Sequence, residues 1–214
     1  MKTEMQATAQ RVLQAVRVTT RFTARFAALS AVLMLASASS QAQGAFTVPD
    51  GYVLEALTPT GGKIARPKDW IVKDGRTGSG WAWTMLPEES ENGHYETGLQ
   101  LHAIVGIEMT SKMTRAAYVK NVLAEKKAGA KLVRECPQSV QGRLQRQCLE
   151  VIETIERKGE SKAYHMLYWG FWSDDIDIVG LFMFGAPQEQ WEAFKGSAEV
   201  LSGLEFIGPN FDPK

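Results

Sequence analysis

Three histidines are the side chains best suited to acid–base chemistry near neutral pH: His94, His102 and His165. Each would need a carboxylate or a second ligand beside it to act as a catalytic base or to hold a metal. If the strands that carry them pair suitably, His102 meets Glu108 and His165 meets Glu153. An acid–base or metal site is therefore one interpretation of the sequence.

Recognised catalytic motifs do not add to that interpretation. No serine lies in a Gly-x-Ser-x-Gly elbow, and no glycine-rich loop has the spacing that cradles phosphate. A small hydrolase or metal-dependent enzyme would have to use His102 or His165 with Glu108 or Asp177. We predict no catalytic, metal or cofactor residue, and we keep this enzyme as the alternative function.

An acidic stretch contains Asp174, Asp175 and Asp177. A Ca²⁺ site needs about 6 to 8 oxygen ligands, and this stretch lacks both the Asp-x-Asp-x-Asp-Gly spacing and a following glutamate. Aspartate is common in turns, where its side chain bonds to the backbone. The pattern therefore predicts a turn between two strands.

Two cysteines, Cys136 and Cys148, enclose a polar stretch with Gly142 near its middle. This spacing predicts a hairpin that places the cysteines opposite each other, at a Cα separation that a disulfide accepts. The spacing is not Cys-x-x-Cys, and no histidines join it in a metal pattern. A structural disulfide is expected, with a redox-active pair as the alternative.

Aromatic side chains crowd the expected strand at residues 162–172 and its neighbour at 176–184, on both faces. One face can lie under a helix. The other is either covered by a second helix, which we favour because two-sided burial is ordinary in layered folds, or is an exposed groove for a partner. The groove would include the candidate partner surface Trp81, Trp83, Tyr168 and Trp172.

The elements that position these residues follow from hydrophobic periodicity and turn residues. Thr114 caps a helix expected over residues 114–127, and Pro187 opens one expected over 187–201. The expected strands cover residues 52–57, 63–66, 70–73, 81–86, 98–106, 131–136, 147–157, 162–172, 176–184 and 204–207.

Strands joined by such short links pair antiparallel. The order of elements predicts an α+β domain, a twisted antiparallel sheet flanked by helices, over residues 43–207, with a tail at 208–214. The length that remains after residue 42 is typical of a single domain.

The first 42 residues resemble a secretory signal peptide. Arginines precede an uncharged apolar run of 11 residues, 26–36, which is shorter than the roughly 20 residues that cross a membrane. Cleavage is expected after Ala42 or, alternatively, after Ala38. No cysteine near these points could carry a lipid. An uncleaved anchor and an organelle transit peptide are the other readings.

Cleavage after Ala42 removes five basic side chains and one acidic side chain from 24 of each, which leaves a net charge of −4. A mildly acidic domain without a basic stripe is a poor match for nucleic acid or anionic lipid. We therefore expect a periplasmic or secreted protein without a membrane span.

A corner at residues 64–70 has the form apolar-x-x-Pro-x-x-Trp, and a late helix carries an aromatic face at residues 190–194. With the long antiparallel run between them, the chain resembles the PsbP/Mog-type fold and its exported bacterial relatives similar to DcrB, over roughly residues 52–207. The resemblance implies an α-β-α sandwich that binds proteins or occasionally ions, and implies no enzyme activity or site residue.

The resulting prediction is an exported, non-enzymatic binding or accessory protein of the bacterial envelope. Its expected partner is a protein, held by the aromatic surface or by the acidic loop at residues 88–96.

Overall fold

The computed structural model describes residues 46–89, 96–157 and 160–211. The expected signal peptide, its cleavage position and His94 lie outside these residues. Most of the loop at 88–96 lies outside them too, so the acidic loop is described only at its ends.

The main element is an antiparallel sheet with the strand order β3-β4-β5-β10-β9-β8-β6. A short strand, β7, pairs with β8 outside this order. The strands are β3 Ile71–Thr77, β4 Gly80–Leu86, β5 Gly98–Ile104, β6 Lys131–Glu135, β7 Ser139–Gln141, β8 Leu144–Arg157, β9 Glu160–Trp172 and β10 Val179–Pro187.

A second, smaller antiparallel sheet has the order β1-β2-β11. Its strands are β1 Tyr52–Leu57, β2 Gly61–Pro67 and β11 Glu205–Ile207. The helices are α1 Ile107–Ser111, α2 Arg115–Lys127 and α3 Trp191–Ser202, and a 3-10 turn, η2 Gln188–Gln190, precedes α3.

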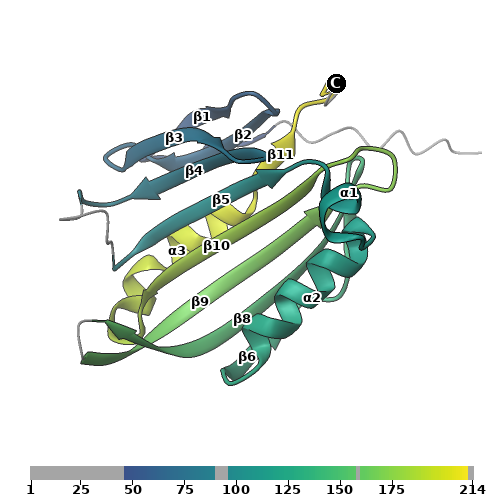
Figure 1. Cartoon of the computed structure of the whole chain (residues 1–214). Coiled ribbons are helices and arrows are strands. Elements are labelled where there is room, and N and C mark those ends of the chain that lie inside the picture. The colour runs from purple at the N-terminus through teal and green to yellow at the C-terminus, as the bar shows by residue number, and fades with distance from the viewer. Residues whose placement is uncertain (1–45, 90–95, 158–159, 212–214) are drawn as a thin grey trace, which may run out of the picture. The chain divides into compact units, whose positions relative to one another are not determined.

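The helices cover opposite faces of the large sheet, with α2 on one side and α3 on the other (Figure 1). Two glycines allow close approach on these faces. A Cβ at Gly170 would lie 2.2 Å from Cγ1 of Val119 in α2, and a Cβ at Gly180 would lie 2.7 Å from the Phe206 ring of β11. The small sheet and α3 therefore share one face, and α2 lies on the other.

The predicted α+β sandwich is confirmed, and so is the Thr114 cap, whose Oγ1 accepts a hydrogen bond from the Ala117 amide at 3.2 Å. At the expected corner around Pro67, the chain leaves the small sheet at β2 and enters the large sheet at β3. Pro187 ends β10 rather than opening the last helix. The helix α1 and the strand β7 were not predicted.

The predicted disulfide between Cys136 and Cys148 is confirmed, with a Cα–Cα distance of 4.9 Å. The hairpin turn lies between β7 and β8, where Gly142 has a φ of 59° that favours glycine. None of the helices in the described part of the chain is long and apolar enough to cross a membrane.

Candidate functional site

The four aromatic residues of the candidate partner surface do not lie on one surface. Trp81 and Trp83 pack with the α3 face, whereas Tyr168 and Trp172 pack with the α2 face. Three of them are buried, with exposed fractions of 1% for Trp83, 3% for Tyr168 and 2% for Trp172. At β9 the structure thus corresponds to the covered alternative, because a helix lies on each face there, and the four residues form no common groove.

His165 contacts a different carboxylate from the expected one. Its Nε2 donates to Oε1 of Glu150 at 2.7 Å, and its ring stacks on Trp191 of α3 with centroids 3.8 Å apart. Glu153 faces the other side of the sheet, because it lies directly opposite Tyr164. The pairing of His165 with Glu153 was therefore wrong by one residue of register.

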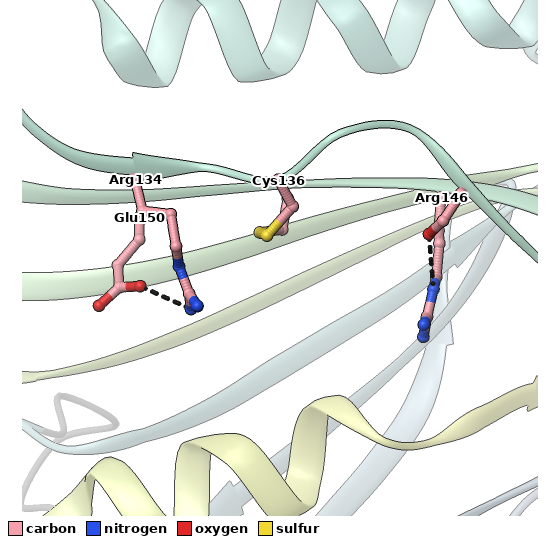
Figure 2. Close-up of a disulfide and its surroundings, with 6 residues drawn as sticks. Arg134, Cys136, Arg146 and Glu150 are labelled. Carbon is pink, nitrogen blue, oxygen red and sulfur yellow. Dashed lines mark hydrogen bonds and ion pairs between the residues drawn. A yellow bond between two sulfur atoms is a disulfide. The ribbon is translucent and has the colours of Figure 1, made fainter.

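Glu150 also pairs with Nη2 of Arg134 at 2.8 Å, beside the disulfide (Figure 2). His165 and Glu150 are each only 8% exposed, and Trp191 covers the imidazole. A substrate has no room against the His165 ring. This arrangement fastens α3 to the sheet and does not resemble a reactive centre.

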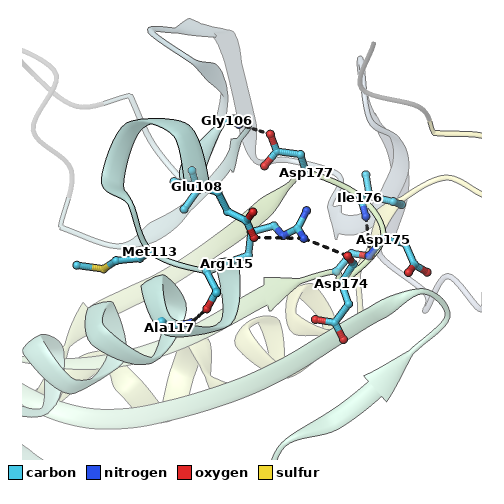
Figure 3. A network of polar contacts seen from close by, with 12 residues as sticks. Gly106, Glu108, Met113, Arg115, Ala117, Asp174, Asp175, Ile176 and Asp177 are labelled. Atoms are coloured by element: carbon cyan, nitrogen blue, oxygen red, sulfur yellow. Dashed lines mark hydrogen bonds and ion pairs between the residues drawn. The ribbon is translucent and has the colours of Figure 1, made fainter.

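The acidic turn is used for structure. Oγ of Ser173 accepts from the amides of Asp175 and Ile176, and the carboxylate of Asp177 accepts from the Gly106 amide at 3.0 Å (Figure 3). The turn at 173–176 thus uses the Asp175 amide, and the tether to the loop before α1 uses the Asp177 carboxylate.

Glu108 does not reach His102. It pairs with Arg115 at 3.3 Å, and Arg115 also donates to the Asp174 carbonyl (Figure 3). Over residues 46–89, 96–157 and 160–211, no group of three or more His, Cys, Asp or Glu side chains is placed to hold a metal. Glu108 and Asp177 are thus occupied elsewhere, and neither joins His102 or His165.

His102 lies on the α2 face of β5 and is half-buried. Burial lowers the pKa of its imidazole, because the charged form loses hydration. Within the described residues, its ring makes no hydrogen bond or ion pair. The imidazole is therefore mainly neutral at pH 7, and its ring nitrogens can bond to a ligand.

Around His102 the α2 face is open. On β5, Leu101 and Ala103 point to the α3 face and are fully buried, whereas the intervening Gln100 and His102 are only half-buried. The same alternation occurs on the neighbouring strands β4 and β10. We call the half-buried band on the α2 face the open trough, formed by Ala82, Thr84, Gln100, His102, Leu181 and Met183.

The trough exists because α2 lies over β8, β9 and β10 and leaves the β4–β5 side of the sheet without a helix (Figure 1). A hollow opens at each end. The hollow at the end of β5 measures about 410 Å³ and is lined by His102, Ile104, Tyr118 of α2 and hydroxyls of α1. Its lining side chains carry no formal charge when His102 is neutral.

The hollow at the start of β5 measures about 190 Å³ and is more enclosed. We call it the tyrosine hollow. Its lining residues are Glu96, Gly98, Gln100, Lys126, Glu153, Ile155, Tyr164, Met166, Tyr168, Met183 and Gly185. Because Gln100 lines this hollow and His102 lines the other, two residues apart on one face of β5, the trough joins the two hollows.

Tyr168 is the polar centre of the tyrosine hollow. Its hydroxyl donates to Oε1 of Glu153 at 2.7 Å, and Nζ of Lys126 lies 5.4 Å from the ring centroid. Burial, and then the hydrogen bond to the Glu153 carboxylate, raise the pKa of Tyr168. The phenol therefore keeps its proton and remains a donor to Glu153.

The sequence analysis did not single out Gln100 or Lys126, and it did not place Glu153 beside Tyr168. The two-residue alternation did place His102 opposite Leu101. The extent of the trough, however, depends on where α2 lies across the sheet, and no local pattern gives that position.

A scan against protein-family models and a search of curated proteins found no match to this chain. Solved structures of similar fold were found. One is the cyanobacterial PsbP (CyanoP) of Synechocystis sp. PCC 6803, at 13% identity and a TM-score of 0.45, covering 74% of this chain and 93% of that one. A PsbP is thus among the structures to which this chain is similar, as its sequence resemblance predicted.

Two further structures are similar at 10% identity. LpqN of Mycobacterium tuberculosis, described as involved in cell envelope biogenesis, has a TM-score of 0.40 and covers 72% of this chain and 90% of that one. A protein of unknown function from Pseudomonas aeruginosa has a TM-score of 0.38, and the match covers 69% of this chain and 91% of that one. These similarities concern the fold and carry no conclusion about function.

Proposed function

We propose that this protein is exported to the bacterial envelope, by cleavage of a signal peptide near residue 42, and acts there as a non-enzymatic binding protein. The disulfide supports this compartment, since disulfides persist mainly outside the cytoplasm. The single observation that carries the binding function is the open trough, where one face of β4 and β5 lacks the cover that the other face has.

The occupant that we propose is an extended segment of a partner protein. The trough follows β5, whose seven residues span roughly 20 Å at about 3.3 Å each. Sites for small molecules bury most of their ligand in one concave pocket. The trough instead has two hollows joined by half-exposed side chains, which suits a chain that lies along it.

The polar groups of the trough also suit a peptide. A peptide backbone brings both N–H donors and C=O acceptors that need partners. The Gln100 amide offers both kinds of group, and the neutral His102 imidazole offers one of each. Neither side chain has a hydrogen bond within the described residues. Both are therefore available to a bound segment.

Selection from a library of displayed heptapeptides tests this proposal. The protein, expressed from the full-length sequence, is expected to enrich specific peptides, and Gln100→Trp is expected to weaken their binding at least tenfold by filling the trough. A matched control is Gln138→Trp, because Gln138 is exposed between β6 and β7, away from the trough. It should bind as the wild type does.

Equal enrichment by the wild type and Gln100→Trp would refute a binding role for the trough. So would peptides whose binding is lost in Gln138→Trp. Thermal unfolding of both variants checks that the domain remains folded.

A further inference from the structure

We infer that the tyrosine hollow binds an alkylammonium or guanidinium group, and that it receives a lysine or arginine side chain of the segment in the trough. The part concerning a side chain depends on the proposed function. The preference for a cation is a property of the hollow itself, and it follows from three sets of contacts.

The first is a carboxylate without a counter-ion. Glu153 is half-buried in the hollow and accepts a hydrogen bond from Tyr168, but it has no ion pair within the described residues. The other lining carboxylate, Glu96, is held by Lys162 at 3.0 Å. Glu153 therefore supplies a negative charge that has no direct ion pair where hydration is reduced, which favours a cation.

The second is the face of Tyr168. A phenol that donates to a carboxylate gains electron density in its ring, and a cation is attracted to such a face within about 6 Å of its centroid. Tyr164, Ile155 and the sulfur-bearing side chains of Met166 and Met183 form the apolar part of the lining. This part of the wall is apolar and polarisable, and suits the alkyl part of a lysine or arginine.

The third is the position of Lys126. Its ammonium lies over the Tyr168 ring at 5.4 Å, and it forms no ion pair within the described part of the chain. The protein's own cation therefore occupies the rim of the place that we assign to the ligand. Lys126 is carried by α2, is half-buried and lines the hollow, so an entering cation competes with it for the Tyr168 ring.

Because Lys126 competes with the ligand, its removal should increase the affinity of the hollow for a cation. We expect n-butylammonium, added to protein with ¹³C-methyl methionine, to shift the methyl signals of Met166 and Met183 saturably. Glu153→Gln keeps the acceptor for Tyr168 but removes the charge, and should weaken this binding on the order of five- to tenfold. Lys126→Met removes the competitor, and should strengthen the binding several-fold.

The controls test the charge of the ligand and the position of the lysine on α2. n-Butanol should shift the same signals only weakly, and sodium butyrate should not shift them. Lys127→Met, one residue along α2, removes a lysine that pairs with Glu135 away from the hollow. It should leave the affinity for n-butylammonium unchanged.

Binding of butyrate in preference to n-butylammonium would overturn the inference, as would weaker ammonium binding in Lys126→Met. The result of the peptide selection is independent of the result with n-butylammonium. If n-butylammonium behaves as expected but no peptide is enriched, the cation site stands and the proposed partner segment does not. If peptides are enriched without a basic residue at one position, the trough stands and its cation subsite does not.

Discussion

The two faces of the large sheet are built from the same strands but are completed differently. The α3 face is covered by a helix and by the small sheet, and holds Trp83, Phe171, Phe182 and Phe206, each no more than 1% exposed. The α2 face is covered by one helix over β8, β9 and β10, and its β4–β5 side is half-exposed. We call them the closed face and the open face.

Under the proposed function, one face of the sheet provides stability and the other provides binding. Burial of large apolar side chains is the main favourable term in folding, and the closed face concentrates it. The open face has weaker cover and carries Gln100 and His102, whose side chains make no hydrogen bond within the described residues. Changes on the closed face should therefore alter the free energy of unfolding, and changes in the trough should alter binding with little effect on stability.

The largest effect is expected from Phe206→Ala on the closed face. Phe206 stacks on Phe171 at 5.4 Å and packs over Gly180, so its removal leaves a cavity between the two sheets. The free energy of unfolding should fall by about 3 to 5 kcal/mol. Urea unfolding of this variant beside Gln100→Ala measures it, and similar losses in the two variants would abolish the contrast between the faces.

The disulfide is the next largest contribution. Cys136 and Cys148 are 12 residues apart, and a loop of this size stabilises by about 2 to 3 kcal/mol in the chain-entropy model. The double variant Cys136→Ala and Cys148→Ala should lose this amount and keep the affinity of trough-binding peptides. Mass measurement with and without reductant checks the bond, and two free thiols in native protein would contradict it.

A smaller loss is expected where α2 touches the sheet. In Gly170→Ala the new methyl group meets Val119, and overpacking of this kind costs about 1 to 3 kcal/mol. Val119→Ala makes room for that methyl group. The double variant should therefore be more stable than the sum of the two single losses predicts. Additive losses in thermal unfolding would mean that α2 does not pack on Gly170 as described.

The smallest effect concerns His102 and pH. Burial lowers the folded-state pKa of His102 below its ordinary value of 6.5, so protonation favours the unfolded chain. This contribution to stability is present above pH 6.5 and is lost as the pH falls through the folded pKa. NMR titration of the imidazole should show a pKa below 6.5, and His102→Gln should reduce the loss of stability on acidification. An unshifted or raised pKa would contradict burial of this side chain.

The sequence predicted what depends on local pattern. Thr114 marks the start of α2, the alternation around Leu101 gives the faces of β5, and the spacing of Cys136 and Cys148 gives the hairpin. These features depend on hydrogen bonding and side-chain direction within one or two elements, so neighbouring residues are enough to show them.

Register across several strands could not be predicted. A slip of one residue moves a side chain to the opposite face. Pairing Arg157 with Glu160 places Ile152, not Glu153, opposite His165, and so brings Glu150 to the imidazole. Likewise Trp81 and Tyr168 lie on strands separated by β5 and β10, and only the full set of pairings shows that they face apart.

The central claim is that the open face, and not the closed one, binds a partner segment. The most direct test is to add a selected peptide to protein with ¹³C-methyl methionine. Met183 in the trough and Met166 in the tyrosine hollow should shift, whereas Met85, fully buried on the closed face, should not. A peptide that shifts Met85 and leaves Met166 and Met183 unchanged would contradict the account.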